Sequence, residues 1–136
     1  MIRRQFLTIS AAALTLAPLP ARAAYEAVTY DRTLPRALRE TGDSVIYNFR
    51  PPWSWACRLK EEIIADLLRE NPGYRRLTFV DVDWDTYGPS EWAERRMKVR
   101  RQSTLVAMKG ADEIARVEND PRRHSLQGLL DAALAA

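Results

Sequence analysis

The chain has 136 residues, of which 46% are hydrophobic and 29% charged, and this length favours a single domain. Its formal net charge of +3 comes from Arg3, Arg4 and Arg22, because the remaining 18 basic residues balance 18 acidic ones. These three arginines precede a predicted cleavage site, so the rest of the chain is formally neutral, and neither nucleic acid nor membranes are expected as partners.

Residues 1–23 have the pattern of an export signal. Arg3 and Arg4 come first, an apolar run follows from Phe6 to Leu19, and Ala21-Arg22-Ala23 supplies small residues for cleavage. The apolar run is too short, and too interrupted by prolines, for a transmembrane helix. "RRQFL" resembles the twin-arginine consensus, while an ordinary Sec signal is the alternative. We therefore expect a periplasmic or otherwise exported protein, with one domain over residues 24–136 and no membrane span after cleavage.

The lone cysteine, Cys57, excludes an internal disulfide. An exported domain of this length must therefore be held together by a packed core, and a little over a hundred residues suffice for one.

Alternating and helical patterns of apolar residues predict the elements in chain order. Thr33 is expected to cap the first helix, and Ser125 the last. The sequence Lys109-Gly110-Ala111-Asp112 has the composition of a hairpin turn. Strands are expected at 25–31, 44–49, 77–82, 104–108 and 113–117, and helices at 34–40, 58–70, 90–99 and 125–134.

The predicted order is β-α-β-α-β-α-β-β-α. Strands that alternate with helices pair in parallel through crossover helices, and the final hairpin adds antiparallel strands. The fold class is therefore α/β, with a central mixed sheet flanked by helices and a C-terminal β-hairpin and helix.

This order resembles the thioredoxin family, and so does the stretch "VIYNFRPPWSWACRLKEEI", which covers the second predicted strand and the start of the second predicted helix. In that family an apolar strand leads through a short loop into W-C-x-x-C-K at the start of a long helix. Downstream, "VRRQSTLVAMKGADEIARV" resembles the family's cis-proline loop, threonine, strand, Lys-Gly turn and strand. As a whole the chain is similar to small exported thioredoxin-related proteins of bacteria.

The resemblance implies an active site that has lost most of its chemistry. The family's attacking cysteine falls on Ser54 and its resolving cysteine on Cys57, in the sequence Ser-Trp-Ala-Cys. Its buried aspartate falls on Asn48, and its cis-proline falls on Ser103, just before Thr104. Disulfide exchange needs an attacking thiolate and a second thiol, which one cysteine cannot supply. An efficient dithiol–disulfide reductase is therefore not expected.

Two functions remain open at this stage. Cys57 in the first turn of a helix, where the helix dipole favours a thiolate, is a candidate monothiol that forms mixed disulfides. The alternative is a redox-inactive module, in which Cys57 is a small buried hydrophobe and the groove binds a protein partner. For Ser54 we expect an N-cap that accepts a hydrogen bond from the Cys57 amide.

The remaining site residues point to a surface and not to a cofactor. Trp53 matches the family's tryptophan and is expected to cover the site. Trp55, followed by Ala56, is either an exposed anchor for a partner or folds back onto the loop. Asp81, Asp83 and Asp85 are expected at a solvated strand end, and His124 on the surface, so no metal or other cofactor is expected. Neither the partner nor the oligomeric state follows from the sequence.

Overall fold

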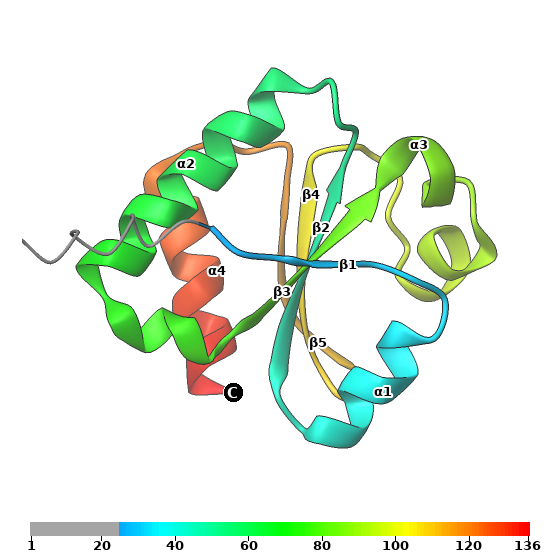
Figure 1. Cartoon of the computed structure of the whole chain (residues 1–136), viewed down its shortest axis with the longest axis horizontal. Coiled ribbons are helices and arrows are strands. Elements are labelled where there is room, and N and C mark those ends of the chain that lie inside the picture. The colour runs from blue at the N-terminus through cyan, green and yellow to red at the C-terminus, as the bar shows by residue number, and fades with distance from the viewer. Residues whose placement is uncertain (1–24) are drawn as a thin grey trace, which may run out of the picture.

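A five-stranded mixed sheet organises the computed structural model, which describes residues 25–136 (Figure 1). The predicted signal segment, with Arg3 and Arg4, lies outside the described residues. The strand order is β1-β3-β2-β4-β5, in which β1 and β2 pair with β3 in parallel and β4 is antiparallel to β2 and β5. The strands are β1 (Val28–Thr29), β2 (Ser44–Arg50), β3 (Thr78–Asp83), β4 (Thr104–Lys109) and β5 (Asp112–Glu118).

Helices cover both faces of this sheet (Figure 1). α2 (Trp55–Glu70) and α4 (Arg123–Ala135) lie on one face with the 3₁₀ turn η1 (Pro72–Arg76). α1 (Leu34–Thr41), α3 (Trp84–Tyr87) and the π-helical turn η2 (Trp92–Arg96) lie on the other. No helix among residues 25–136 is long and apolar enough to cross a bilayer.

Strand alternation divides the apolar side chains into two cores, since successive residues of a strand point to opposite faces. Ile46 of β2 and Leu105 of β4 pack with α2 and α4, in the core that also holds Leu126. Tyr47 and Phe49 point the other way, into the core that contains Met97. The same alternation directs Asn48, between Tyr47 and Phe49, toward the α2 face.

Most predicted elements are confirmed, with shifted ends. The first strand is only Val28–Thr29, at the sheet edge next to β3, although the prediction covered 25–31. The helix predicted over 58–70 is α2, and it begins at Trp55, three residues before the predicted start. The hairpin turn is confirmed, and Gly110 at φ +62° supplies the left-handed backbone that it requires.

The helix predicted over 90–99 is confirmed only in part, because the segment holds a single π-helical turn, η2. A separate short helix, α3, precedes the segment, and the Asp83 carboxylate caps its start by accepting a hydrogen bond from the Asp85 amide at 3.1 Å. In η2 the Met97 amide bonds the Trp92 carbonyl, five residues back, at 2.9 Å.

Neither predicted hydroxyl caps its helix. Thr33 occupies the predicted N-cap position of α1 but makes no capping bond, and the Asp31 carboxylate accepts the amide hydrogen bonds of Thr33 and Leu34 at 2.8 and 3.1 Å. Ser125 lies inside α4 and donates to Asp120 at 2.7 Å. At α1 the Asp31 carboxylate thus takes the role assigned to the Thr33 hydroxyl, whereas α4 begins after Arg122 without a side-chain cap.

Candidate functional site

The motif Ser-Trp-Ala-Cys lies where β2 ends and α2 begins. The Ser54 hydroxyl accepts a hydrogen bond from the Cys57 amide at 3.3 Å, so the predicted N-cap is confirmed. Ala56 is half-buried in the first turn of the helix. Cys57 is 0% exposed, because its side chain points from the helix toward the sheet and the loop before β4.

Ser103 closes the site from the opposite side. The Cys57 Sγ and Ser103 Oγ atoms are 3.2 Å apart. The Ser103 amide donates to the Phe49 carbonyl at 2.8 Å, and Ser103 has φ +65°, in the left-handed region. No cis peptide bond occurs within residues 25–136, so the bond before Ser103 is trans, as is usual before a residue other than proline. The neighbouring Thr104 is buried, and its hydroxyl donates to the Arg101 carbonyl at 2.8 Å.

Lys60 is a site residue that the sequence analysis missed. It is 2% exposed, and its ammonium group donates a hydrogen bond to the Ser103 carbonyl. Burial lowers the pKa of Lys60 to about 8, while negative charge on Cys57 and, less strongly, on Glu61 acts in the opposite sense. The signal was its spacing, since Cys57, Lys60 and Ile64 recur at helical intervals on the buried face of α2.

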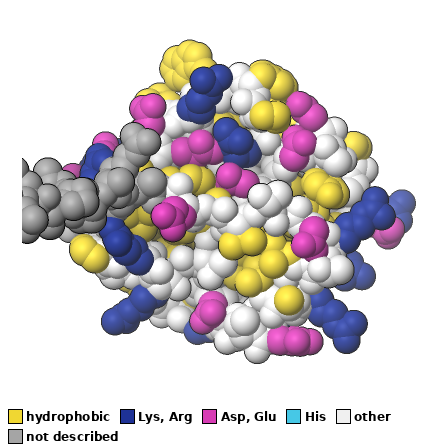
Figure 2. Space-filling model, viewed as in Figure 1, with side chains coloured by type: hydrophobic (Ala, Val, Ile, Leu, Met, Phe, Trp, Pro, Cys, Tyr) yellow, Lys and Arg dark blue, Asp and Glu magenta, His cyan; other side chains and the backbone are white. Residues whose placement is uncertain are grey.

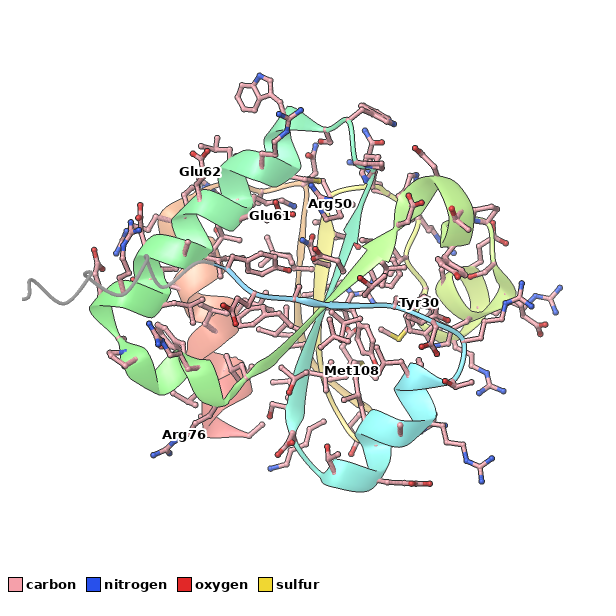
Figure 3. All side chains as sticks on the ribbon, in the orientation of Figure 1. Tyr30, Arg50, Glu61, Glu62, Arg76 and Met108 are labelled. Atoms are coloured by element: carbon pink, nitrogen blue, oxygen red, sulfur yellow. The ribbon has the colours of Figure 1, made fainter. Side chains whose placement is uncertain are left out.

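Asn48 is the centre of a polar network below α2. Its side-chain amide lies 3.1 Å from Glu61 Oε1, 3.2 Å from Asp81 Oδ1 and 3.3 Å from the Tyr25 hydroxyl. Tyr25 donates to Asp81 Oδ1 at 2.6 Å, and Arg50 forms an ion pair with Glu61. Figure 3 shows Arg50 and Glu61 directed toward each other between the end of β2 and α2. Three acceptor groups thus share the two protons of one amide.

The register of the sheet explains how this network forms. Asn48 is paired with Asp81 across β2 and β3, so both side chains point to the α2 face. Glu61 comes one turn after Cys57 on α2 and reaches the same place. Asp81, expected at a solvated strand end, is instead part of this network.

The site therefore still contains two carboxylates, those of Glu61 and Asp81, which lie beside Asn48. Burial raises the pKa of Glu61, and the Arg50 guanidinium opposes that shift. The pKa of Tyr25 lies well above its ordinary value, first because the phenol is buried and then because Asp81 is near. Among the described residues, Asn48 Oδ1 accepts no hydrogen bond, and Arg50 Nε is held by its ion pair with Glu61 and not by a hydrogen bond of good geometry.

The two tryptophans next to Ser54 are on the surface. Trp53 is 62% exposed and Trp55 is 70% exposed. Trp53 Nε1 donates to Asp85 Oδ2 at 3.2 Å, which directs the indole toward the start of α3. We expected Trp53 to cover the site, but its ring is largely exposed and bonded to Asp85. Of the two orientations open for Trp55, the exposed one is present.

Within residues 25–136 no group of histidine, cysteine and acidic side chains has an arrangement that could hold a metal ion. Asp83 accepts hydrogen bonds from Asp85 and Thr86 at the start of α3. His124 lies exposed in the first turn of α4.

No protein-family model matches the chain, and no curated protein does. Solved structures do. Trxlp from Edwardsiella tarda is 20% identical with a TM-score of 0.62, over 76% of this chain and 98% of that one. A thioredoxin from Nicotiana alata is 15% identical with a TM-score of 0.65, over 81% and 94%. A cysteine-to-serine mutant of a thioredoxin from Entamoeba histolytica is 22% identical with a TM-score of 0.62, over 79% and 100%. Residues 25–136 therefore form a thioredoxin fold, and the chain that carries it has a single cysteine.

Proposed function

We propose that this protein is an exported thioredoxin-fold module that binds an extended, apolar segment of a partner protein around Ser54 and does not exchange dithiols with it. The observation that carries the proposal is the pair Ser54 and Cys57. The position from which a thiolate would attack holds a hydroxyl that caps α2, and the one thiol has no exposed surface. A serine hydroxyl without a strong adjacent base does not replace a thiolate.

The exposed tryptophans supply the binding half of the proposal. Trp53 and Trp55 present two large amphipathic rings on either side of Ser54, and such rings are the side chains that most often anchor protein interfaces. The Trp53–Asp85 hydrogen bond restricts one of the rings before binding, so less entropy is lost when a partner docks. An apolar segment fits this surface better than an acidic one, because Asp85 lies beside Trp53.

A thiol at position 54 can test this docking directly. In the variant Ser54→Cys, Cys57→Ala, the new thiol attacks cysteine peptides activated as mixed disulfides, and the rate reports how well each peptide docks. We expect apolar peptides to react faster than acidic ones of equal length. Adding Trp53→Ala and Trp55→Ala should remove that preference. Equal rates for all peptides, or a preference that survives loss of both tryptophans, would contradict the proposal.

A second candidate function is monothiol redox chemistry at Cys57. The observation in its favour is the buried Lys60 ammonium, whose positive charge lies near the thiol in the first turns of α2. Its test is the reaction of folded protein with a small thiol reagent and with glutathione disulfide at neutral pH. Modification of Cys57 as fast as that of an exposed thiol would favour this function over simple binding.

Export is the third part of the proposal. It is supported by the arginine pair, the apolar run and the Ala-x-Ala pattern in residues 1–23. Sequencing of the secreted form should give a new N-terminus near Ala24. Replacing Arg3 and Arg4 by lysine should block export by a twin-arginine route, and unchanged export would indicate the Sec route.

A further inference from the structure

A groove of about 510 Å³ lies between α1 and η2, and shares no lining residue with the site around Cys57. Its floor is aromatic. Tyr30 stacks on Trp92 with ring centroids 4.5 Å apart, and Tyr87 meets the Tyr30 ring edge-on at 4.7 Å. Tyr30, labelled in Figure 3, lies between the two segments. Four arginines line this α1–η2 groove: Arg32, Arg36, Arg39 and Arg96.

These arginines leave an excess of positive charge in the groove. Within residues 25–136, Arg32, Arg39 and Arg96 form no ion pair, and Arg36 lies 3.9 Å from Glu40. The one carboxylate that lines the groove, Glu91, lies 3.6 Å from Arg95 outside it. In Figure 2, Lys and Arg side chains lie along the right and lower-right edge of the molecule, the side on which Figure 1 places α1 and η2, and others lie at the left edge and the top.

We propose that the α1–η2 groove binds an acidic segment of a partner protein. Its volume lies within the range of ligand sites. A guanidinium presents a planar fork of donors that matches a carboxylate, and three such forks without an ion-pair partner suit several carboxylates along one chain. This surface is separate from the tryptophan surface around Ser54, so either one can bind without the other.

The surroundings favour an acidic peptide over the other anions that arginines bind. Trp92 stacks on both Tyr30 and Phe49, and Tyr30 is only 5% exposed, so a nucleotide base would find little ring face on which to stack. Exposed Glu91 lines the groove and exposed Glu40 lies 3.9 Å from Arg36, so a rigid duplex or a lipid surface, which cannot bend around single side chains, would be repelled by them. A short, flexible acidic peptide can place its carboxylates on the arginines and bend away from these two glutamates.

The test is binding of a fluorescent hexaglutamate peptide to the full chain, measured by anisotropy at low salt and again at high salt. Hexaglutamine is the uncharged control, and a short DNA oligonucleotide is the competing anion. The variant Arg39→Gln, Arg96→Gln removes two groove charges. The charge-matched control is Arg75→Gln, Arg76→Gln on η1, where both arginines are exposed and Figure 3 places Arg76 on the far side from the groove. Circular dichroism confirms that each variant is folded.

We expect hexaglutamate to bind in a salt-sensitive manner and hexaglutamine not to bind. The groove variant should weaken hexaglutamate binding roughly fivefold or more, as loss of two exposed ion pairs implies, and the η1 control should change it less than about twofold. Equal losses in the two variants, no binding at low salt, or DNA binding as tight as that of the peptide would each overturn the proposal.

Discussion

Lys60 is the most unusual residue of the site, because an ammonium group is rarely buried without a carboxylate partner. Its bond to the Ser103 carbonyl replaces part of its lost hydration, yet burial still lowers its pKa to about 8. The unfolded chain therefore binds more protons than the folded chain between about pH 8 and the ordinary lysine value of 10.5. The Lys60 contribution destabilises the fold below pH 8, and that cost disappears as pH rises through this window.

Replacing Lys60 by methionine should therefore stabilise the protein. We expect a gain of about 1–3 kcal/mol in the free energy of unfolding at pH 7, because the long apolar side chain fills the same space without a charge to desolvate. The difference between the two proteins should shrink from pH 8 to 10.5. Urea unfolding across that range measures it, with the exposed Lys109→Met as control. A destabilised Lys60→Met with an unchanged pH profile would show that the Ser103 bond outweighs the burial.

Asn48 provides the second test at the scale of single residues. From the sequence, Asn48→Asp restores the family's buried acid and should raise thiol exchange in a chain with two cysteines. The structure predicts a loss of stability for the same substitution, because Asp81 and Glu61 already lie 3.2 and 3.1 Å from the Asn48 amide. A carboxylate at position 48 would face the two carboxylates that now accept hydrogen bonds from the Asn48 amide.

We therefore expect Asn48→Asp to lower the free energy of unfolding by about 2–4 kcal/mol at pH 7. The pKa of the new carboxyl should be raised in the folded state, so the loss should diminish as pH falls and the group is protonated. Urea unfolding between pH 4 and 8 measures this, and the exposed Asn119→Asp serves as control. Full stability at pH 7 would mean that Arg50 neutralises the cluster more effectively than its single ion pair with Glu61 implies.

At the scale of elements, the start of α2 decides where both Ser54 and Cys57 lie. The Ser54 hydroxyl bonds the Cys57 amide, which would otherwise be a buried donor without a partner in the first turn. Ser54→Ala should cost about 0.5–2 kcal/mol in the free energy of unfolding, and Ser54→Gly only a few tenths. Guanidinium unfolding of the three proteins compares them. Equal costs for alanine and glycine would place the effect in packing and not in the cap.

At the scale of the whole molecule, the thioredoxin fold still presents the geometry for a disulfide. In Ser54→Cys the two sulfurs have the C-x-x-C spacing at a helix start, so an internal disulfide should form. Turnover in insulin reduction should nevertheless stay roughly 100-fold or more below that of an ordinary thioredoxin. The reason is that Asn48 supplies no acid–base group for Cys57, and Ser103 in place of the proline contacts the thiol directly.

The measurement is insulin reduction with a chemical reductant, for the unmutated chain, Ser54→Cys, and Ser54→Cys with Cys57→Ala as the single-thiol control. The unmutated chain and the control should be inactive. Activity in the unmutated chain would contradict the proposed function. Full activity in Ser54→Cys would show that neither Asn48 nor Ser103 limits exchange.

Much of this protein follows from its sequence alone. The order of strands and helices, the hairpin at Gly110 and the cap at Ser54 are written in local patterns, because periodicity, turn composition and capping act over a few residues. The frame from Phe49 to Cys57 was enough to place the one thiol and the missing one. Local reasoning was less successful at Thr33, where Asp31 accepts the amide bonds, at Ser125, which lies inside α4, and over 90–99, where only a π-helical turn forms.

Only the tertiary structure decided which polar residues meet. Asn48, Asp81 and Glu61 come from three elements, and they lie together because the β2–β3 register pairs the first two while α2 crosses above them. Lys60 is buried because the face of α2 that holds Cys57 turns toward the Ser103 loop, although a lysine in a helical sequence is ordinarily assigned to solvent. Local sequence fixes the direction of a side chain relative to its own element, whereas its partners depend on register and packing between distant elements.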